Sequence, residues 1–154
     1  MKQYHYTESG LDNIWLANGF EITETNGDKE IYIHDIHGLH KMIGLLLIEK
    51  QGLLSGKEIR FIRTTLDFSQ GVLARLLGCT YQTVLLWEKD RGTISKTADR
   101  LLRVMFFEYL NPENDRTAYE LINQIADLEA ETTAAANLDK IIFEEKSDEW
   151  RRVA

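Results

Sequence analysis

Four neighbouring side chains in the middle of the sequence have types and spacings suited to contact with nucleic acid. Tyr81, Gln82 and Lys89 fall at intervals that place them on one face of a helix, and Thr83 lies beside them. A glutamine amide can form two hydrogen bonds with an adenine, and a threonine can offer its hydroxyl or its methyl group to a base edge. A lysine can neutralise a phosphate. Side chains of these types on one free face of a helix could contact a nucleic acid.

These side chains need a helix that is held from behind, and the sequence around them has the spacing of two short helices that cross at a tight turn. Ser69 can cap the first helix, and Gly78 can end it in the left-handed conformation. Thr80 can cap the second helix, in which Val84 and Trp87, three residues apart, point inward. The sequence therefore predicts a helix-turn-helix whose outer face is free to enter a groove.

Residues 56–110 resemble the helix-turn-helix domain of the Cro and lambda-repressor class of bacterial and phage regulators, also called XRE-like. The resemblance is carried by Gln70, Ala74, Gly78, Val84, Trp87 and Glu88. Residues 55–103 are more closely similar to the DNA-binding half of MqsA-type antitoxins. The cysteine pairs of the zinc-binding half of those antitoxins are absent from this chain, so toxin binding does not carry over with the resemblance.

In the docking mode of this class, the second helix lies in the major groove and the first helix contacts the sugar-phosphate backbone. The resemblance implies a phosphate contact from Gln70 and base contacts from Gln82 and Thr83, while Tyr81 would reach a phosphate or a sugar and Leu86 a thymine methyl group. It also implies an ion pair between Arg63 and Glu88. The expected DNA-binding residues are Gln70, Thr80, Tyr81, Gln82, Thr83, Leu86, Lys89, Arg91 and Lys96.

The distribution of charge favours the same segment as the DNA-binding part, although the chain as a whole has a net charge of −7. Residues 51–112 carry nine basic and six acidic side chains, whereas residues 1–50 and 113–154 are both acidic. Lys89, Arg91 and Lys96 follow the second helix, where they would neutralise phosphates. The acidic flanks should reduce indiscriminate binding to nucleic acid.

The flanking sequence predicts an α+β protein that is mainly helical, with a bundle of four to five helices. Further helices are expected at 36–51, 56–65 and 95–110, the last of them burying Leu101, Leu102 and Phe106. Residues 13–34, with Asn26-Gly27 as a hairpin turn, predict a small N-terminal antiparallel sheet. A C-terminal helix at 117–131 and a short strand pair around Lys146-Ser147-Asp148 complete the expected fold.

Three segments follow from this pattern: a β-rich segment with a helix (1–50), the helix-turn-helix domain (51–112), and a C-terminal helix and tail (113–154). A single such domain makes few DNA contacts, so we expect a homodimer that reads an inverted repeat. The C-terminal helix is the favoured dimerisation element, and the apolar helix with residues 45–48 is the alternative. With no apolar run of about 18 residues and no signal region, we expect a cytoplasmic protein without membrane contact.

Other constellations give weaker signals. His34, His37 and His40 stand three apart, but satisfied or exposed histidines are the favoured interpretation, and we expect neither a metal nor a cofactor. Five aromatic residues near the N-terminus could line a ligand pocket, although they more often form the core of a small sheet: Tyr4, Tyr6, Trp15, Phe20 and Tyr32. No nucleophile or carboxylate pair has a catalytic context, so an enzyme is not expected.

The leading functional hypothesis is a sequence-specific transcription regulator that binds double-stranded DNA, most simply a repressor of its own promoter. An antitoxin that holds a toxin or other partner protein and binds the shared promoter is the alternative. A metal-dependent or ligand-sensing regulator built on the N-terminal sheet is a third hypothesis. A small toxin-like reading frame beside the gene would favour the second, and metal analysis would test the third.

Overall fold

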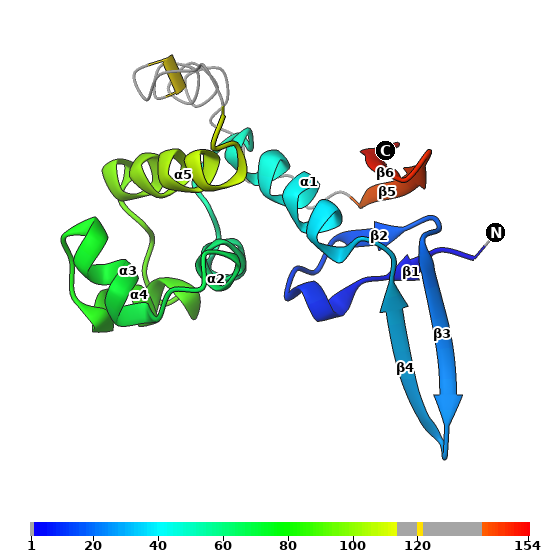
Figure 1. Ribbon diagram of the computed structural model, residues 1–154. Coiled ribbons are helices and arrows are strands. Elements are labelled where there is room, and N and C mark those ends of the chain that lie inside the picture. The colour runs from blue at the N-terminus through cyan, green and yellow to red at the C-terminus, as the bar shows by residue number, and fades with distance from the viewer. Residues whose placement is uncertain (1, 114–119, 122–139) are drawn as a thin grey trace. The chain divides into compact units, whose positions relative to one another are not determined.

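The computed structural model of the chain describes residues 2–113, 120–121 and 140–154, and it is α+β (Figure 1). The chain divides into two compact units, Met1–Met42 with Leu138–Ala154 and Ile43–Asn137. These units do not follow the three consecutive segments that the sequence suggested, because strands near the C-terminus pair with a strand near the N-terminus. Most of the helix expected at 117–131 lies outside the described residues.

The first unit is built on a four-stranded sheet in the order β1-β2-β5-β6. Its strands are β1 (Tyr4–His5), β2 (Ile14–Leu16), β5 (Ile141–Lys146) and β6 (Glu149–Arg152), and a 3-10 turn (Thr7–Ser9) separates the first two. β2 and β5 run parallel, with Trp15 opposite Ile142, and the other two pairs are antiparallel. The expected N-terminal antiparallel sheet is therefore confirmed only in part: β1 and β2 are antiparallel, but the four-stranded sheet is mixed because a segment remote in sequence supplies two of its strands.

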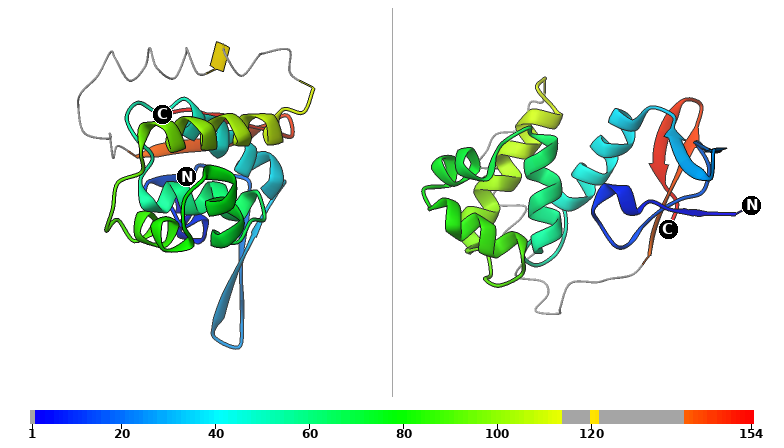
Figure 2. Two further views of the ribbon diagram at one scale, coloured as in Figure 1. Left: turned by 90° about the vertical axis from the view of Figure 1, so that its left-hand side faces the viewer. Right: turned by 90° about the horizontal axis from the view of Figure 1, so that it is seen from below.

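A separate two-stranded ribbon is formed by β3 (Phe20–Thr25) and β4 (Asp28–Ile33), which pair in register around the turn at Asn26-Gly27 (Figure 2). Asn26 and Gly27 both have positive φ, 54° and 85°, as a tight two-residue hairpin turn requires. This part of the sequence-based prediction is confirmed. Most of the ribbon is exposed, including Ile22 and Tyr32.

Helix α1 (Ile36–Ile48) begins soon after β4 and contains the division between the two units. Leu39, Ile43, Leu47 and Ile48 are buried, in agreement with the expectation that this helix is covered on more than one side. Within the apolar stretch at 45–48, Leu47 and Ile48 are buried, and Leu45 and Leu46 are half-buried.

The second unit contains α2 (Gly56–Thr65), α3 (Gln70–Leu77), α4 (Tyr81–Glu88) and α5 (Lys96–Leu110). Each helix begins after a serine or threonine whose side chain accepts a hydrogen bond from a backbone N–H three residues further on: Ser55, Ser69, Thr80 and Ser95. Leu102 and Phe106 of α5 are buried as expected, but Leu101 is 40% exposed, so that part of the prediction is wrong. Leu101 lies beside the buried face of the helix, which includes Ala98, Leu102 and Phe106.

A buried ion pair lies within α5, and both of its side chains also form hydrogen bonds with the backbone between the end of α1 and the start of α2. Arg103 is 1% exposed, and its Nε lies 2.9 Å from Oδ2 of Asp99. The guanidinium also donates to the carbonyl oxygens of Ile48 and Lys50, while Asp99 accepts from the backbone N–H of Leu54. Backbone groups that a loop would otherwise leave unsatisfied are thereby paired. Within the described part of the chain, no helix has both the length and the apolar composition needed to cross a bilayer.

Candidate nucleic-acid interface

Helices α3 and α4 are joined by a three-residue turn, Gly78, Cys79 and Thr80. Gly78 has φ 74°, and its N–H and that of Cys79 both return to the carbonyl of Ala74, which ends α3. Thr80 then caps α4 through a hydrogen bond from the N–H of Thr83. The short turn sends the chain directly from one helix into the next.

The inner face of α4 is held by apolar burial and by close packing against α2. Val84 is fully buried and Trp87 nearly so. Gly56, the first residue of α2, lies against the end of α4, because a Cβ built there would come within 2.4 Å of the carbonyl oxygen of Trp87. The N–H of Gly56 donates to Asp90, just beyond α4. These contacts fix the position of α4 relative to α2.

Arg63 of α2 and Glu88 of α4 form the ion pair that the family resemblance implied. Nε and Nη2 of Arg63 donate to the two carboxylate oxygens of Glu88 at 2.6 and 2.9 Å, which is a bidentate arrangement. Nη1 of the same guanidinium donates to the carbonyl of Phe68 before α3. One arginine therefore connects α2, the segment leading to α3, and α4.

The outer face of α4 is left exposed by this packing. Tyr81 is 49% exposed and Leu86 45% exposed, and Gln82 is also exposed. Thr83 is half-buried, and its hydroxyl lies 2.9 Å from that of Thr80. Gln82 is therefore better placed than Thr83 to offer polar atoms to a ligand, because part of the hydrogen-bonding capacity of Thr83 is already used.

Gln70 differs from its expected environment. Its Nε2 donates to Oε1 of Glu88 at 3.2 Å, so its amide belongs to the group that fixes α4. A phosphate contact from this amino group would have to replace or share that bond. Sequence spacing could place Gln70 at the start of α3, but it gave no signal of the bond to Glu88.

The expected basic residues lie on the surface. Lys89 and Arg91 follow α4, and Lys96 is the first residue of α5; all three side chains are exposed. The backbone N–H of Arg91 donates to the carbonyl of Leu86, so the segment after α4 turns back on the helix end. Positive side chains therefore continue from the exposed face of α4 into the following loop.

Comparison of the chain with protein-family models, curated proteins and solved structures found no match.

The three evenly spaced histidines do not come together. His40 lies with its Nε2 2.8 Å from the hydroxyl of Tyr6, His37 is exposed in the first turn of α1, and His34 is bonded to Glu145. Burial lowers the pKa of His40, and its electrostatic interaction with His37 lowers it further. A spacing of three residues places side chains on one face only within a helix, and His34 lies before α1 begins. His37 and His40 lie in α1 but have different surroundings.

The N-terminal aromatic residues do not form a single pocket either. Tyr4 contacts Phe20, with ring centroids 5.3 Å apart, and Trp15 stacks on His5. Tyr6 is buried, whereas Tyr32 is 61% exposed on β4. The five rings therefore occupy distinct environments.

Proposed function

We propose that α3 and α4 act as a helix-turn-helix and that the exposed face of α4 binds the major groove of double-stranded DNA, making this protein a sequence-specific transcription regulator. The observation that carries the proposal is the contrast between the two faces of α4. The inner face is fixed by Val84, Trp87 and the Arg63–Glu88 pair, while the outer face presents Tyr81 and Gln82 to solvent.

A helix fixed in this way is suited to reading base edges. Recognition requires that the reading side chains be held in place before the ligand arrives, because ordering them on binding would reduce affinity. The bidentate pair and the contact at Gly56 supply that rigidity. A glutamine on the exposed face can discriminate adenine by two hydrogen bonds, and an exposed leucine can contact thymine methyl groups.

The positive charge of the surface next to this face supports the same proposal. Lys89, Arg91 and Lys96 are exposed next to the proposed reading face, where they would contact phosphates. Phosphate contacts position a protein on the duplex, and base contacts then select the sequence. Loss of a basic residue should therefore weaken binding to every DNA sequence, whereas loss of Gln82 should weaken binding only to the preferred sequence.

One such surface covers only a few base pairs, so the proposal includes a symmetric dimer that reads two half-sites about one helical turn apart. The simplest regulatory outcome is repression at an operator that overlaps a promoter. The segment that dimerises is proposed to be the C-terminal helix, most of which lies outside the described residues.

Selection from a random pool of DNA duplexes with the full-length protein tests this proposal. Repeated rounds should enrich an inverted repeat with half-sites about one turn apart, with adenine or thymine at the positions facing α4. Failure to enrich any sequence over successive rounds, with folded protein confirmed by circular dichroism, would refute sequence-specific binding.

A further inference from the structure

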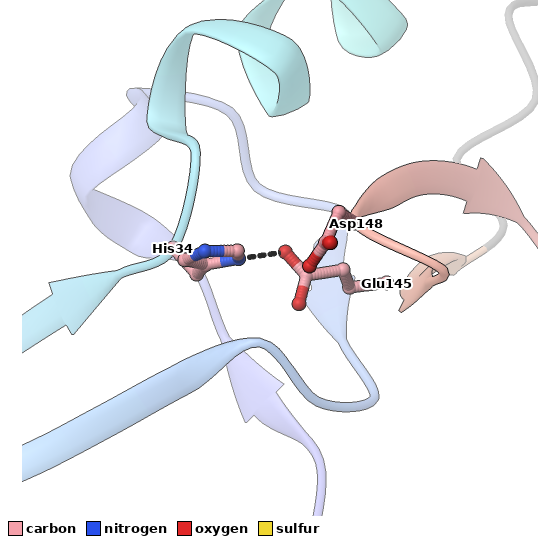
Figure 3. Close-up of side chains that lie close together, drawn as sticks. All are labelled: His34, Glu145 and Asp148. Carbon is pink, nitrogen blue, oxygen red and sulfur yellow. Dashed lines mark hydrogen bonds and ion pairs between the residues drawn. The ribbon is translucent and has the colours of Figure 1, made fainter.

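A cluster of side chains that could ligate a metal ion lies in the first unit. None of its residues belongs to the proposed reading face on α4. The cluster brings together His34, which follows β4, Glu145 of β5, and Asp148 in the β5–β6 turn (Figure 3). One donor atom from each residue lies within 4.8 Å of the others. Nδ1 of His34 is bonded to Oε2 of Glu145, as the dashed line in Figure 3 shows.

The backbone of His34 is fixed independently of this cluster. The indole Nε1 of Trp150, in β6, donates to the carbonyl oxygens of His34 and Asp35 at 3.1 and 3.2 Å. The N–H of His34 donates to the carbonyl of Gly19 at 2.9 Å. The fold therefore holds the imidazole near β5 by contacts that do not involve its ring.

The backbone of Glu145 is fixed in the same way by a single side chain. The amide oxygen of Asn18 accepts from the N–H of Glu145 at 2.7 Å, and the amide nitrogen of Asn18 donates to its carbonyl at 3.2 Å. A reciprocal pair of this kind defines the position of the glutamate closely. Its side chain is 18% exposed, so one carboxylate of the cluster is largely shielded from bulk water.

Asp148 enters the cluster through the shape of its turn. Ser147 and Asp148 both have positive φ, 55° and 63°, and they connect the last pair of the β5–β6 ladder, Lys146 and Glu149. Aspartate tolerates this conformation better than most residues with a side chain. Figure 3 shows the side chain of Asp148 on the same side as that of Glu145. The two carboxylates thus approach the imidazole from adjacent positions.

We propose that His34, Glu145 and Asp148 form a binding site for a divalent transition-metal cation, with Zn²⁺ as the best-matched ion. Zn²⁺ accepts imidazole nitrogen and carboxylate oxygen together, whereas Mg²⁺ and Ca²⁺ prefer oxygen ligands alone. Two carboxylates supply the negative charge that a dication requires. Because His34 is about half exposed, with 47% of its side chain accessible, water would complete the coordination.

Such a site would connect parts of the chain that are remote in sequence. The ligands His34 and Glu145 are separated by 111 positions, and the cation would link the end of β4 to the β5–β6 hairpin. Binding to the folded state alone raises stability in proportion to the logarithm of the free cation concentration. The consequence is a metal-dependent rise in the melting temperature of the protein.

The site predicted here differs from the histidine cluster considered from the sequence. His37 and His40 are not ligands, and the two carboxylates come from the C-terminal strands. His34 was the only member that local spacing could indicate. The matched control variant is therefore His37→Ala, which removes an exposed histidine three residues from the proposed ligand.

The test measures Zn²⁺ and Mg²⁺ binding to the full-length protein by equilibrium dialysis, with melting temperature as a second readout. We expect saturable binding of one Zn²⁺ per chain and an increased melting temperature. His34→Ala, Glu145→Gln and Asp148→Asn should each weaken Zn²⁺ binding by at least about tenfold, and His37→Ala should leave it unchanged. Asp148→Asn is the most informative variant, because it preserves the His34–Glu145 pair and the turn-forming ability of the residue.

The competing account is an ordinary ion pair between His34 and Glu145 without any metal. Absence of saturable Zn²⁺ binding, or Zn²⁺ binding of unchanged strength in Asp148→Asn and His34→Ala, would overturn the proposal. Mg²⁺ binding as strong as Zn²⁺ binding would overturn the assignment of the imidazole as a ligand. Circular dichroism of each variant separates loss of a ligand from loss of folding.

Discussion

Glu88, the last residue of α4, accepts two hydrogen bonds from Arg63 of α2 and a third from Gln70 of α3. The glutamate side chain is only 5% exposed, so three helices meet at one shielded carboxylate. The orientation of α4, and with it the direction in which Gln82 points, depends on this contact.

Glu88→Gln should destabilise the protein by about 3 kcal/mol, because loss of one member of a shielded pair leaves the other charge uncompensated. Urea unfolding measures the change. Glu108→Gln, in the exposed part of α5, is the matched control and should change stability by less than about 0.5 kcal/mol. Equal effects of the two substitutions would show that the pair does not fix α4.

Gly56→Ala should also destabilise the protein, by about 1 to 3 kcal/mol, because the new Cβ would lie 2.4 Å from the carbonyl oxygen of Trp87, a backbone atom that cannot move aside. Gly71→Ala in α3 is the control. A Cβ at Gly71 meets nothing closer than 3.9 Å, and alanine favours a helix over glycine by about 1 kcal/mol. Thermal unfolding should therefore show opposite signs for the two variants. A neutral Gly56→Ala would contradict close packing of α2 against α4.

Lys89→Gln should weaken binding to all DNA sequences alike and should reduce the salt dependence of the affinity. Each phosphate contact contributes about 0.9 to the slope of log affinity against log salt concentration, so the slope should fall by about that amount. Anisotropy titrations across a salt series provide the measurement. Lys41→Gln, on the exposed side of α1, should leave the slope unchanged. A slope unaffected by the loss of Lys89 would remove that residue from the interface.

The stability of the first unit should depend on the protonation of His40. Burial lowers the pKa of His40 below its ordinary value of 6.5, so in acid the unfolded chain binds a proton that the folded chain does not. The contribution of His40 to stability is therefore present above pH 6.5 and is lost as the pH falls below that value. A titration of the His40 ring by NMR measures the shift directly. A midpoint at or above 6.5 would contradict the buried contact with Tyr6.

Local signals in the sequence were sufficient for the helices of the second unit. Ser69 and Thr80 cap the helices that they were expected to cap, because a cap depends on residues within one turn of it. Gly78 and Asn26-Gly27 adopt the positive φ values that their turns require, for the same reason. The resemblance, rather than local pattern, supplied the Arg63–Glu88 pair.

Contacts between remote segments could not be predicted in this way. Nothing in the composition of residues 141–146 indicates that they pair in parallel with Ile14–Leu16, because strand pairing depends on the whole fold. The approach of Glu145 and Asp148 to His34 follows from that pairing, so it could not be predicted from the sequence either. The bond between Gln70 and Glu88 also escaped prediction, since helical spacing fixes the position of a side chain but not the partner it selects.

We propose that the exposed face of α4 reads DNA sequence, and the variant Gln82→Ala is the sharpest test of this claim. Anisotropy titrations compare this variant with wild-type protein and with Gln51→Ala, an exposed glutamine before α2, on a selected duplex and on unrelated DNA. Gln82→Ala should lose on the order of 1 to 3 kcal/mol of binding free energy on the selected duplex and almost none on unrelated DNA, while Gln51→Ala behaves as wild type. Unchanged affinity of Gln82→Ala for the selected duplex, or equal affinity of the wild-type protein for both duplexes, would contradict the claim.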